Sequence, residues 1–334
     1  MFSRRKDGVA VTGALLALTL VTACGGGSDD AASSGGSGGG SGETETVAIT
    51  AGVAASQSST ALLLGIEQGF FEDQGIEVTI GQSATGAAGI TQLINGQQQV
   101  ALGGISPVIT AAAGDIPVSI VSGAVNDRED PAGTQYQTIV PADSDVQSFA
   151  DLEGKTVAVN SLQCCWEFWI REAVEKDGGD PSTLELVQLP FPDAVTALRQ
   201  GEVDAISTLQ PFATALRQEG FRDIGDSPAV AFDNPENGNT VFYMSQQFIQ
   251  ENPGIVERWR TALEQSAEYA NANPEATRAQ IIEQTGADAE LVQSAPLPQY
   301  SAEIDRDSIE KEGEFLVKYG VIEEAPDLDS LIAP

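Results

Sequence analysis

Two adjacent cysteines, Cys164 and Cys165, are the side chains of this chain best suited to chemistry, and Trp166 follows them directly. Consecutive Cα atoms lie about 3.8 Å apart across a trans peptide bond, which is below the range of about 4.4–6.8 Å that disulfides usually span. A disulfide between these neighbours would be strained, so the spacing favours two small buried thiols at the start of a helix, with both states left open. In either state, sulfur and an indole ring at a helix N-terminus favour a flat or sulfur-containing ligand. Trp166 and Trp169 are equally typical of a helix face buried in a core.

The chain contains no histidine, which excludes several kinds of catalytic and metal site. Ser–His–Asp and Cys–His catalysis need an imidazole as the base, and His-based zinc sites need it as a ligand. The acidic pattern of a calcium-binding loop is also absent from the sequence. Metal or acid–base sites made of Asp and Glu alone stay possible. Our prediction is a chain that is not an enzyme, binds a small molecule without transforming it, and uses neither a metal nor a cofactor.

Polar residues gather in five loops that follow predicted strands, at residues 54–59, 103–106, 126–128, 160–166 and 208–210. In doubly wound sheets, ligands bind beyond the carboxyl ends of the strands, where helix N-termini offer free N–H groups. Ser and Asn in such loops are equally typical of helix caps and turns. The candidate ligand-binding residues are Gln57, Ser58, Ser106, Asn126, Asn160, Gln163, Cys164, Cys165, Trp166 and Gln210.

Basic side chains are scarce in these loops, where Arg128 is the only one. An anionic ligand would therefore depend on helix N-termini for its counter-charge. A heteroaromatic ligand such as a pyrimidine is equally compatible with the loop composition.

Short β-branched runs alternate with helical patterns through most of the chain. This alternation predicts parallel sheets with helical crossovers and therefore the α/β class. The predicted strands are 47–51, 77–80, 100–102, 118–121, 156–159, 184–189, 205–207 and 240–244. The predicted helices are 60–68, 89–95, 107–113, 166–177, 193–200, 211–219, 255–270, a helix opening at Pro274, and 308–319.

One order of elements occurs twice, about a hundred residues apart. A helix closes at Gly96, a strand follows, and Pro107 opens the next helix; the same order recurs at Gly201 and Pro211. Glycine suits the position after a helix C-terminus, and proline suits the first turn of a helix. The repetition predicts two similar lobes.

The first 45 residues differ in composition from the rest. A basic patch at 4–6 precedes a 13-residue apolar run from Val9 to Val21, too short for the roughly 20 residues of a membrane span. Small residues then lead to Cys24, and 14 of the 18 residues from Gly25 to Gly42 are Gly or Ser. The pattern predicts a secretory signal peptide over 1–23. The cut before Cys24 resembles the lipobox of bacterial lipoproteins, which implies a lipidated Cys24 and a disordered Gly/Ser linker over 24–45.

The formal net charge of −33 at pH 7 limits the partners of the chain. A strongly acidic surface repels nucleic acid and anionic lipid headgroups. We therefore expect no nucleic-acid partner, a monomer, and contact with the membrane through the lipid anchor alone.

Four short segments carry recognisable motifs. Gly65–Val78 has the pattern "G-[FY]-F, G-[IL]-x-V", and Asp151–Val159 has "D-L-x-G-K-x-[VI]-[AG]-V". Gly201–Ala205 has "G-x-[VI]-D-A", and Asn273–Glu275 is "N-P-E". In these motifs and in their order across residues 47–320, the chain resembles solute-binding proteins of ABC importers in the nitrate, sulfonate, taurine and thiamine-pyrimidine (SsuA-like) branch.

The resemblance implies a type II periplasmic-binding-protein-like fold, with two doubly wound lobes joined by two crossing segments. The crossings are expected near Tyr136–Val140 and Asn239–Met244, which gives lobe 1 as 46–135 plus 244–334 and lobe 2 as 136–243. A solute would bind between the lobes and be delivered to an ABC permease. This role implies a location on the extracytoplasmic face of the cell membrane.

Two alternatives remain on the same scaffold. One is an enzyme like the fungal thiamine-pyrimidine synthase. That enzyme has a Cys-rich motif, and Cys164-Cys165-Trp166 of this chain superficially resembles it. That enzyme type is intracellular and relies on histidine, which this chain lacks. The other is a ligand-sensing subunit for a membrane kinase, which the sequence does not distinguish from an importer subunit.

Overall fold

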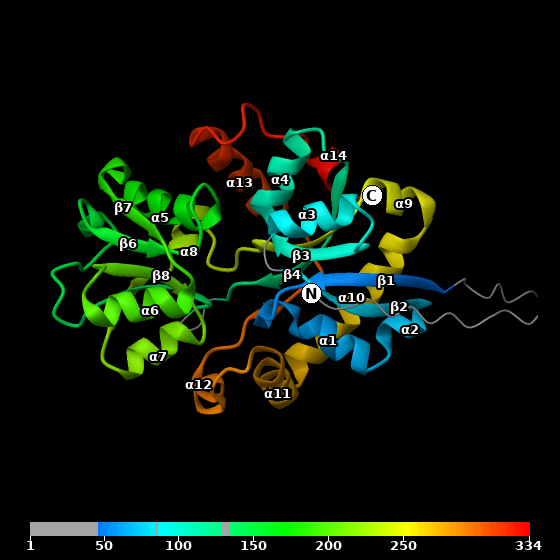
Figure 1. Cartoon of the computed structure of the whole chain (residues 1–334), viewed down its shortest axis with the longest axis horizontal. Coiled ribbons are helices and arrows are strands. Elements are labelled where there is room, and N and C mark those ends of the chain that lie inside the picture. The colour runs from blue at the N-terminus through cyan, green and yellow to red at the C-terminus, as the bar shows by residue number, and fades with distance from the viewer. Residues whose placement is uncertain (1–45, 84–85, 129–133) are drawn as a thin grey trace, which may run out of the picture. The chain divides into compact units, whose positions relative to one another are not determined.

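The computed structural model describes residues 46–334 apart from 84–85 and 129–133. The expectations for the signal peptide, Cys24 and the linker therefore lie outside the described residues. The described residues form one compact unit, which contains two β-sheets (Figure 1). We call the six-stranded sheet with its helices lobe 1, and the five-stranded sheet with its helices lobe 2.

Lobe 1 is built from both ends of the described chain. Its strands are β1 (Val47–Val53), β2 (Ile76–Gln82), β3 (Val100–Gly104), β4 (Val118–Asn126), β10 (Thr240–Ser245) and β11 (Gln299–Tyr300). The helices before the chain leaves lobe 1 are η1 (Gln57–Ser59), α1 (Thr60–Glu67), α2 (Phe70–Asp73), α3 (Gly86–Ile94) and α4 (Ile105–Ala113). Those after its return are α9 (Gln246–Glu251), α10 (Ile255–Ala272), α11 (Pro274–Thr285), α12 (Ala289–Ser294), α13 (Arg306–Lys318) and α14 (Leu328–Leu331).

Lobe 2 is the middle of the chain. Its strands are β5 (Tyr136–Val140), β6 (Thr156–Val159), β7 (Glu185–Gln188), β8 (Ala205–Leu209) and β9 (Arg222–Gly225). Its helices are η2 (Ala150–Leu152), α5 (Cys165–Lys176), η3 (Pro181–Thr183), α6 (Phe191–Gln200), α7 (Phe212–Gln218) and α8 (Ser227–Phe232). Every strand and helix predicted from the alternating pattern is present, with its ends shifted by a few residues, and the α/β class is confirmed.

The two sheets have the same topology. Five strands of lobe 1 lie in the order β2-β1-β3-β10-β4, and those of lobe 2 in the order β7-β6-β8-β5-β9. In each sheet the first three strands are parallel, and the fourth is antiparallel to both of its neighbours. The prediction of two similar doubly wound lobes is therefore confirmed, strand by strand.

The antiparallel strands correct the expected positions of the crossings. Thr240–Met244 pair with β3 and β4 throughout, so residues 240–243 belong to lobe 1 and not, as expected, to lobe 2. Likewise β5, expected as a crossing, pairs wholly within lobe 2. The crossings are the segments before these strands, at 127–135 and 233–239. The reason is local chemistry: 233–239 contains Pro, Gly and three Asn, whereas β10 is apolar and places its backbone groups in a ladder.

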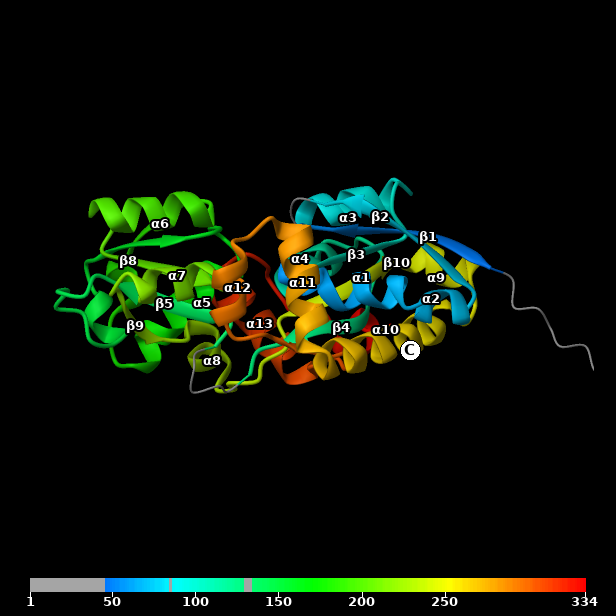
Figure 2. The same cartoon turned by 90° about the horizontal axis from the view of Figure 1, so that it is seen from below.

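Helix α10 covers lobe 1, packing against α1, α2 and β4 (Figure 2). Its Trp259 is fully buried, with ring centroids 5.0 Å from Phe71 and 5.3 Å from Phe242. The indole Nε1 donates to Ser122 Oγ at 3.2 Å. One side chain thereby joins the outer helices to the central strands.

Helix α13 packs against both lobes, contacting α4 in lobe 1 and α5 in lobe 2 (Figure 1). A single hydrophobic cluster runs through the three helices and includes Ile109 on α4, Trp169 on α5 and Phe315 on α13. The lobes therefore share buried apolar surface in addition to their two covalent connections.

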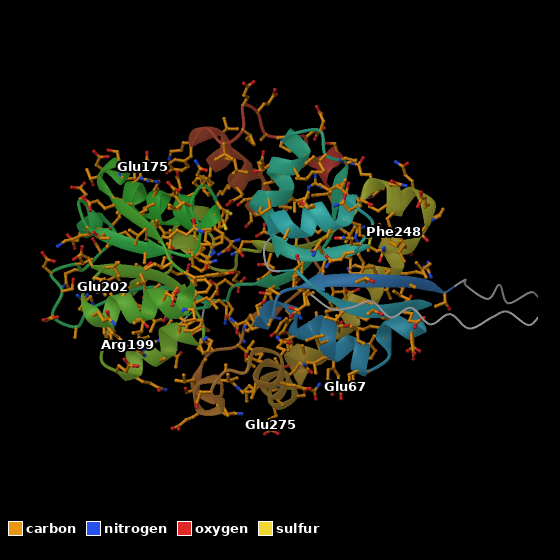
Figure 3. All side chains as sticks on the ribbon, viewed as in Figure 1. Glu67, Glu175, Arg199, Glu202, Phe248 and Glu275 are labelled. Atoms are coloured by element: carbon orange, nitrogen blue, oxygen red, sulfur yellow. The ribbon has the colours of Figure 1, made fainter. Side chains whose placement is uncertain are left out.

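The surface is rich in carboxylates. Glu67, Glu175, Glu202 and Glu275 are exposed on different helices and turns of both lobes (Figure 3). None of the helices in the part of the chain that the structure describes combines the length and apolar character needed to cross a membrane.

We predict that Trp259→Ala lowers the free energy of unfolding by about 3–5 kcal/mol, because it leaves a cavity and an unpaired Ser122 hydroxyl. Urea denaturation measures this loss. Val317→Ala is the control, since Val317 is 39% exposed, and a change within about 0.5 kcal/mol is expected there. A loss below about 1 kcal/mol for Trp259→Ala would contradict its role in joining helices and sheet.

Candidate ligand-binding cleft

A small cavity lies where the two lobes meet at the crossing segments. Its lining residues come from η1 and its approach, from the end of β4, from the start of β5 and from the end of β8. They are Ser56, Gln57, Ser58, Val125, Asn126, Asp127, Gln135, Tyr136, Leu209 and Pro298. The cavity measures about 50 Å³, room for a few waters but well below the roughly 300–1,000 Å³ of typical ligand sites. The lobes are thus in contact here, and a solute needs them to separate.

Hydrogen bonds between amides hold the walls of this cavity together. Gln57 Nε2 donates to Gln135 Oε1, and Gln135 Nε2 donates to the Pro296 carbonyl at 3.2 Å. The Tyr300 hydroxyl donates to the Gln57 carbonyl at 3.2 Å. The polar groups that face the cavity are therefore also those that link lobe 1 to the first crossing segment.

Two carboxyls, Asp127 and Asp226, face each other beside this cavity. Asp127 Oδ1 accepts from the backbone N–H of Arg128 and of Gln135, both at 2.9 Å. Asp226 caps α8, its Oδ1 accepting from Ala229 N at 2.8 Å. Burial raises the pKa of both carboxyls, and each affects the ionisation of the other. The pair therefore places two groups that favour their protonated form where the first crossing segment meets lobe 2.

An aromatic wall forms the lobe 2 side of the seam. Tyr136 lies 5.5 Å from Trp166 and 5.6 Å from Trp169, measured between ring centroids. Trp166 lies 5.1 Å from Phe191, which lies 5.9 Å from Phe212. The rings follow the carboxyl ends of β6, β7 and β8, where a ligand of a doubly wound sheet is expected.

A second cluster gathers where α4, α5 and α13 meet. Glu312 on α13 is fully buried, and its Oε1 accepts from the Ser106 hydroxyl of α4. Its Oε2 accepts from Trp169 Nε1 of α5 at 3.0 Å. Burial raises the pKa of Glu312 from 4.5 to about 7. One carboxyl therefore bonds both lobes from the helix between them.

The two cysteines lie beside this carboxyl as free thiols. Cys164 is the N-cap residue of α5, and its Sγ lies 3.5 Å from Cys165 Sγ. The hydrogen bond from Cys165 lowers the pKa of Cys164 to about 6. The same hydrogen bond, together with burial, raises the pKa of Cys165. The state favoured by the sequence, two thiols at a helix start, is the one the structure has.

The structure brings together only part of the candidate set. Gln57, Ser58 and Asn126 line the cavity, while Ser106, Cys164 and Cys165 form the second cluster beside Glu312.

Four candidates lie elsewhere. Trp166 is 8% exposed within the aromatic wall, and Asn160 is half-buried just after β6. Gln210 is buried just before α7, and its Oε1 accepts from Thr214 N at 3.2 Å and from the Thr214 hydroxyl at 2.7 Å. Gln163 is exposed, with a positive φ of 55°, and faces an outer hollow between α5 and Tyr319. Neither glutamine is brought to the cavity.

Several residues of both clusters were not among the candidates. Asp127 directly follows Asn126 in the loop 126–128, so its position in that loop could have identified it as a candidate. Gln135, Tyr136 and Glu312 carry no such signal, because Gln135 and Tyr136 lie in and after a crossing and Glu312 lies in an ordinary amphipathic helix.

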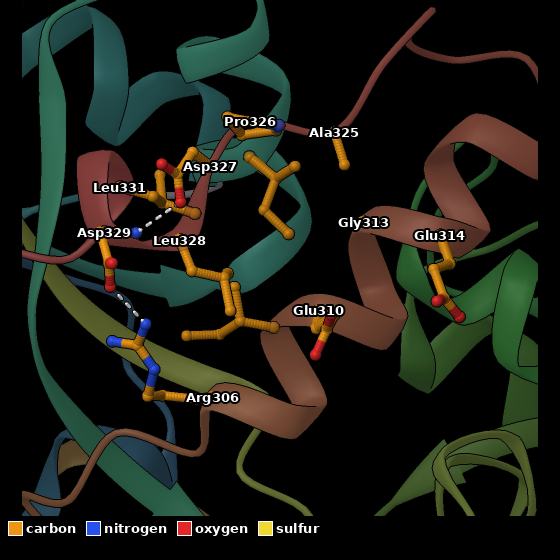
Figure 4. Close-up of a pocket in the computed structure, with 12 residues that line it drawn as sticks. Arg306, Glu310, Gly313, Glu314, Ala325, Pro326, Asp327, Leu328, Asp329 and Leu331 are labelled. Carbon is orange, nitrogen blue, oxygen red and sulfur yellow. Dashed lines mark hydrogen bonds and ion pairs between the residues drawn. The ribbon is translucent and has the colours of Figure 1, made fainter.

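Larger hollows lie on the outer surface. One, of about 440 Å³, is bounded by α13 and the segment 325–331 (Figure 4). Arg306 pairs with Asp329 across it at 2.6 Å, and the exposed carboxylates of Glu310 and Glu314 lie along it. Among the described residues no group of three or more Cys, Asp or Glu is arranged to hold a metal ion.

The fold is that of periplasmic binding proteins: two equivalent doubly wound lobes with a seam at the crossing segments. The chain overlays on the periplasmic aliphatic sulphonate binding protein of Escherichia coli with a TM-score of 0.70, at 16% identity over 86% of this chain and 92% of that one. A desulfurization enzyme, DSZB, has the same fold, with a TM-score of 0.61 at 19% identity over 86% and 96% of the two chains.

Sequence comparison narrows the class. A family model described as NMT1/THI5 like matches residues 56–277, and the chain belongs to that family. The chain is 26% identical over 253 residues to the formylaminopyrimidine-binding protein of Halalkalibacterium halodurans. That alignment covers 75% of this chain and 74% of the other protein.

We predict that Glu312→Gln changes how stability depends on pH. Folded Glu312 keeps its proton between pH 4.5 and about 7, where the unfolded chain has released it, so stability falls as the pH rises through that window. Glutamine still accepts from Trp169 and donates to the Ser106 hydroxyl, without ionising. Between pH 4.5 and pH 7.5, the free energy of unfolding of the variant should therefore rise relative to that of wild type by on the order of 2 kcal/mol.

Urea denaturation at several pH values measures this difference. Glu314→Gln, an exposed position on the same helix, should follow the wild-type profile. Parallel profiles for Glu312→Gln and wild type would show that Glu312 ionises normally in the folded chain.

Proposed function

We propose that the chain is an extracytoplasmic solute-binding subunit of an ABC importer, held to the membrane by a lipid on Cys24. It captures a small solute between its lobes and delivers it to a membrane permease. The support is the two-lobed fold, the cavity at the crossing segments and the nature of the relatives, which are binding proteins for a formylaminopyrimidine and for aliphatic sulphonates. No metal or cofactor enters the proposal.

The ligand class we favour is a neutral, thiamine-pyrimidine-like heteroaromatic. The observation that carries it is the lining of the cavity, which contains the amides of Gln57, Asn126 and Gln135, the ring of Tyr136 and, among the described lining residues, no Lys or Arg. Tyr136 is also the member of the aromatic wall that reaches the cavity, since it packs on Trp166 and Trp169. Amides offer both donors and acceptors, as ring nitrogens and amino groups require, and flat rings stack on aromatic side chains. Arg128 is exposed beyond the carboxyl of Asp127.

A sulfonate, taurine or nitrate ion is the second candidate, supported by the sulphonate-binding neighbour. It would depend on helix N-termini for its charge, chiefly that of α5, whose first turn already contains Glu167. The carboxyls of Asp127 and Asp226 oppose an anion unless they remain protonated.

Catalysis is the alternative from a different class, since an enzyme shares the fold. We propose binding alone, because the chain has no histidine and the polar groups of the seam pair with one another. A sensory role beside a membrane kinase uses the same binding chemistry. Co-purification with a permease rather than a kinase separates the two.

We predict that the purified protein is stabilised against heat by aminopyrimidines more than by taurine, alkanesulfonates or nitrate. Gln57→Ala removes one amide of the seam and should weaken binding of the preferred ligand about 5- to 100-fold, the cost of one or two hydrogen bonds. Gln97→Ala, an exposed amide of lobe 1, should bind as wild type does.

Calorimetric titration and mass spectrometry of any co-purified small molecule make these measurements. Stabilisation by sulfonates alone would overturn the heteroaromatic ligand and keep the binding role. Turnover of a bound pyrimidine would overturn the binding role itself.

We predict that Cys24→Ser releases the protein from the membrane in a bacterial host. The thiol of Cys24 is the proposed acyl acceptor, and the Gly/Ser stretch after it offers no apolar surface to hold the chain there. Wild type should fractionate with membranes and incorporate an alkyne-labelled fatty acid, and the variant should do neither. A membrane-bound Cys24→Ser protein would exclude the lipid as the anchor.

A further inference from the structure

Cys164 and Cys165 do not line the proposed solute cavity, yet the pair lies at the contact between the lobes. An added Cβ at Gly104, which ends β3 in lobe 1, would lie 4.0 Å from Cys165 Sγ. Ser106 of lobe 1 is hydrogen-bonded to Cys164, and Glu312 of α13 is close enough to both thiols to disfavour their ionisation. The pair therefore lies close to β3 and α4 of lobe 1 and to Glu312 of α13 at this part of the interface.

The two thiols differ in a way that suits stepwise chemistry. Cys164 is half-buried and caps the 12-residue helix α5, while Cys165 lies behind it, 8% exposed. The hydrogen bond from Cys165 is the main contact that favours the thiolate of Cys164, with a further hydrogen bond from Ser161, and burial and Glu312 oppose it. The balance lowers the pKa of Cys164 to about 6, whereas the pKa of Cys165 is raised. A helix N-terminus and donated hydrogen bonds are the usual surroundings of reactive thiols.

We propose that Cys164 and Cys165 are a reversible oxidation site for hydroperoxides, with Cys164 as the attacking thiol and Cys165 as the resolving thiol. The Cys164 thiolate attacks the distal oxygen of a hydroperoxide, the O–O bond breaks, and the alkoxide that leaves takes a proton to become the alcohol. Cys164 is then a sulfenic acid. The Cys165 thiol attacks its sulfur, the S–S bond forms, and the hydroxyl leaves with the Cys165 proton as water. Two thiols have supplied the two electrons.

Oxidation reaches the interface through the backbone of Cys164. That residue is extended, with φ −151° and ψ 176°, and its carbonyl accepts from Glu167 N at 3.0 Å and from Phe168 N at 3.3 Å. Bringing the sulfurs from 3.5 Å to bonding distance moves this carbonyl and the loop before it. Because that loop contacts Ser106 of lobe 1, oxidation should alter closure of the lobes. The chemistry does not depend on which solute is bound.

The test uses the full chain with Cys24→Ser, so that these are its only two thiols. Treatment of the reduced protein with stoichiometric hydrogen peroxide should remove two thiols per chain and lower the intact mass by about 2 Da, the mass of two hydrogens, and dithiothreitol should reverse both changes. Cys165→Ser should stop at the sulfenic acid of Cys164, which dimedone traps. Cys164→Ser should resist the same dose, and both variants should keep the wild-type circular dichroism spectrum.

The pH dependence adds an independent readout. With Cys165, Ser106, Ser161 and Glu312 as its neighbours, Cys164 should lose only about tenfold in rate between pH 7.5 and pH 5, whereas an ordinary thiol loses over a hundredfold. Three results would overturn the proposal: two thiols that remain after treatment, a disulfide-linked dimer as the main product, or equal reactivity of Cys164→Ser and wild type.

Discussion

The arrangement of the lobes depends on how one buried carboxyl is satisfied. Glu312 has no exposed surface, and a buried carboxyl is stable only when it is protonated or hydrogen-bonded. Its two donors come from different lobes, the Ser106 hydroxyl from α4 and the Trp169 indole from α5. Pulling the lobes apart at this point leaves at least one buried polar group without its partner, at a cost of roughly 1–3 kcal/mol. This contact and the hydrophobic cluster around α13 keep the seam narrow, and the 50 Å³ cavity is a consequence.

Side-chain carboxylates anchor the described parts of both crossings. In 233–239, Gly238 N donates to Asp305 Oδ2 at 2.9 Å, and around the first crossing Arg128 N and Gln135 N both donate to Asp127 Oδ1. Both anchors are therefore carboxyl groups that hold backbone N–H groups. Each crossing then continues as an antiparallel strand at the same position of its sheet. The equivalence of the lobes thus brings both crossings and the ends of β4 and β8 to the same edge of the seam.

The sequence could predict whatever local chemistry determines. Helix ends at Gly96 and Gly201 follow from the left-handed backbone that glycine adopts, with φ of 68° and 71°. The alternation of strands and helices follows from residue periodicity, and the loops at strand ends located Gln57, Ser58 and Asn126. What local patterns do not carry is the choice of partner. The run 240–244 is plainly a strand, but only its pairing with β3 and β4 assigns it to lobe 1. Glu312 meets Ser106 across 206 residues, and Gln210 looks like a ligand contact until Thr214 is seen to occupy its amide oxygen.

In the proposed function, hydrogen bonds supply less of the net affinity for a solute than stacking does. The groups that would bind it already bind each other: Gln57 pairs with Gln135, and the Tyr136 hydroxyl donates to Asn239 Oδ1 at 2.9 Å. A solute that enters exchanges those bonds for its own, and such exchanges change the free energy little. The aromatic wall is different, because Phe191 and Phe212 remain half-exposed and gain contact only when a flat molecule covers them. A solute can favour the closed lobes only through contacts it makes more strongly in that state. A flat solute that stacks on the rings of lobe 2 and hydrogen-bonds to the amides of lobe 1 makes such contacts. A small inorganic anion cannot stack on the rings.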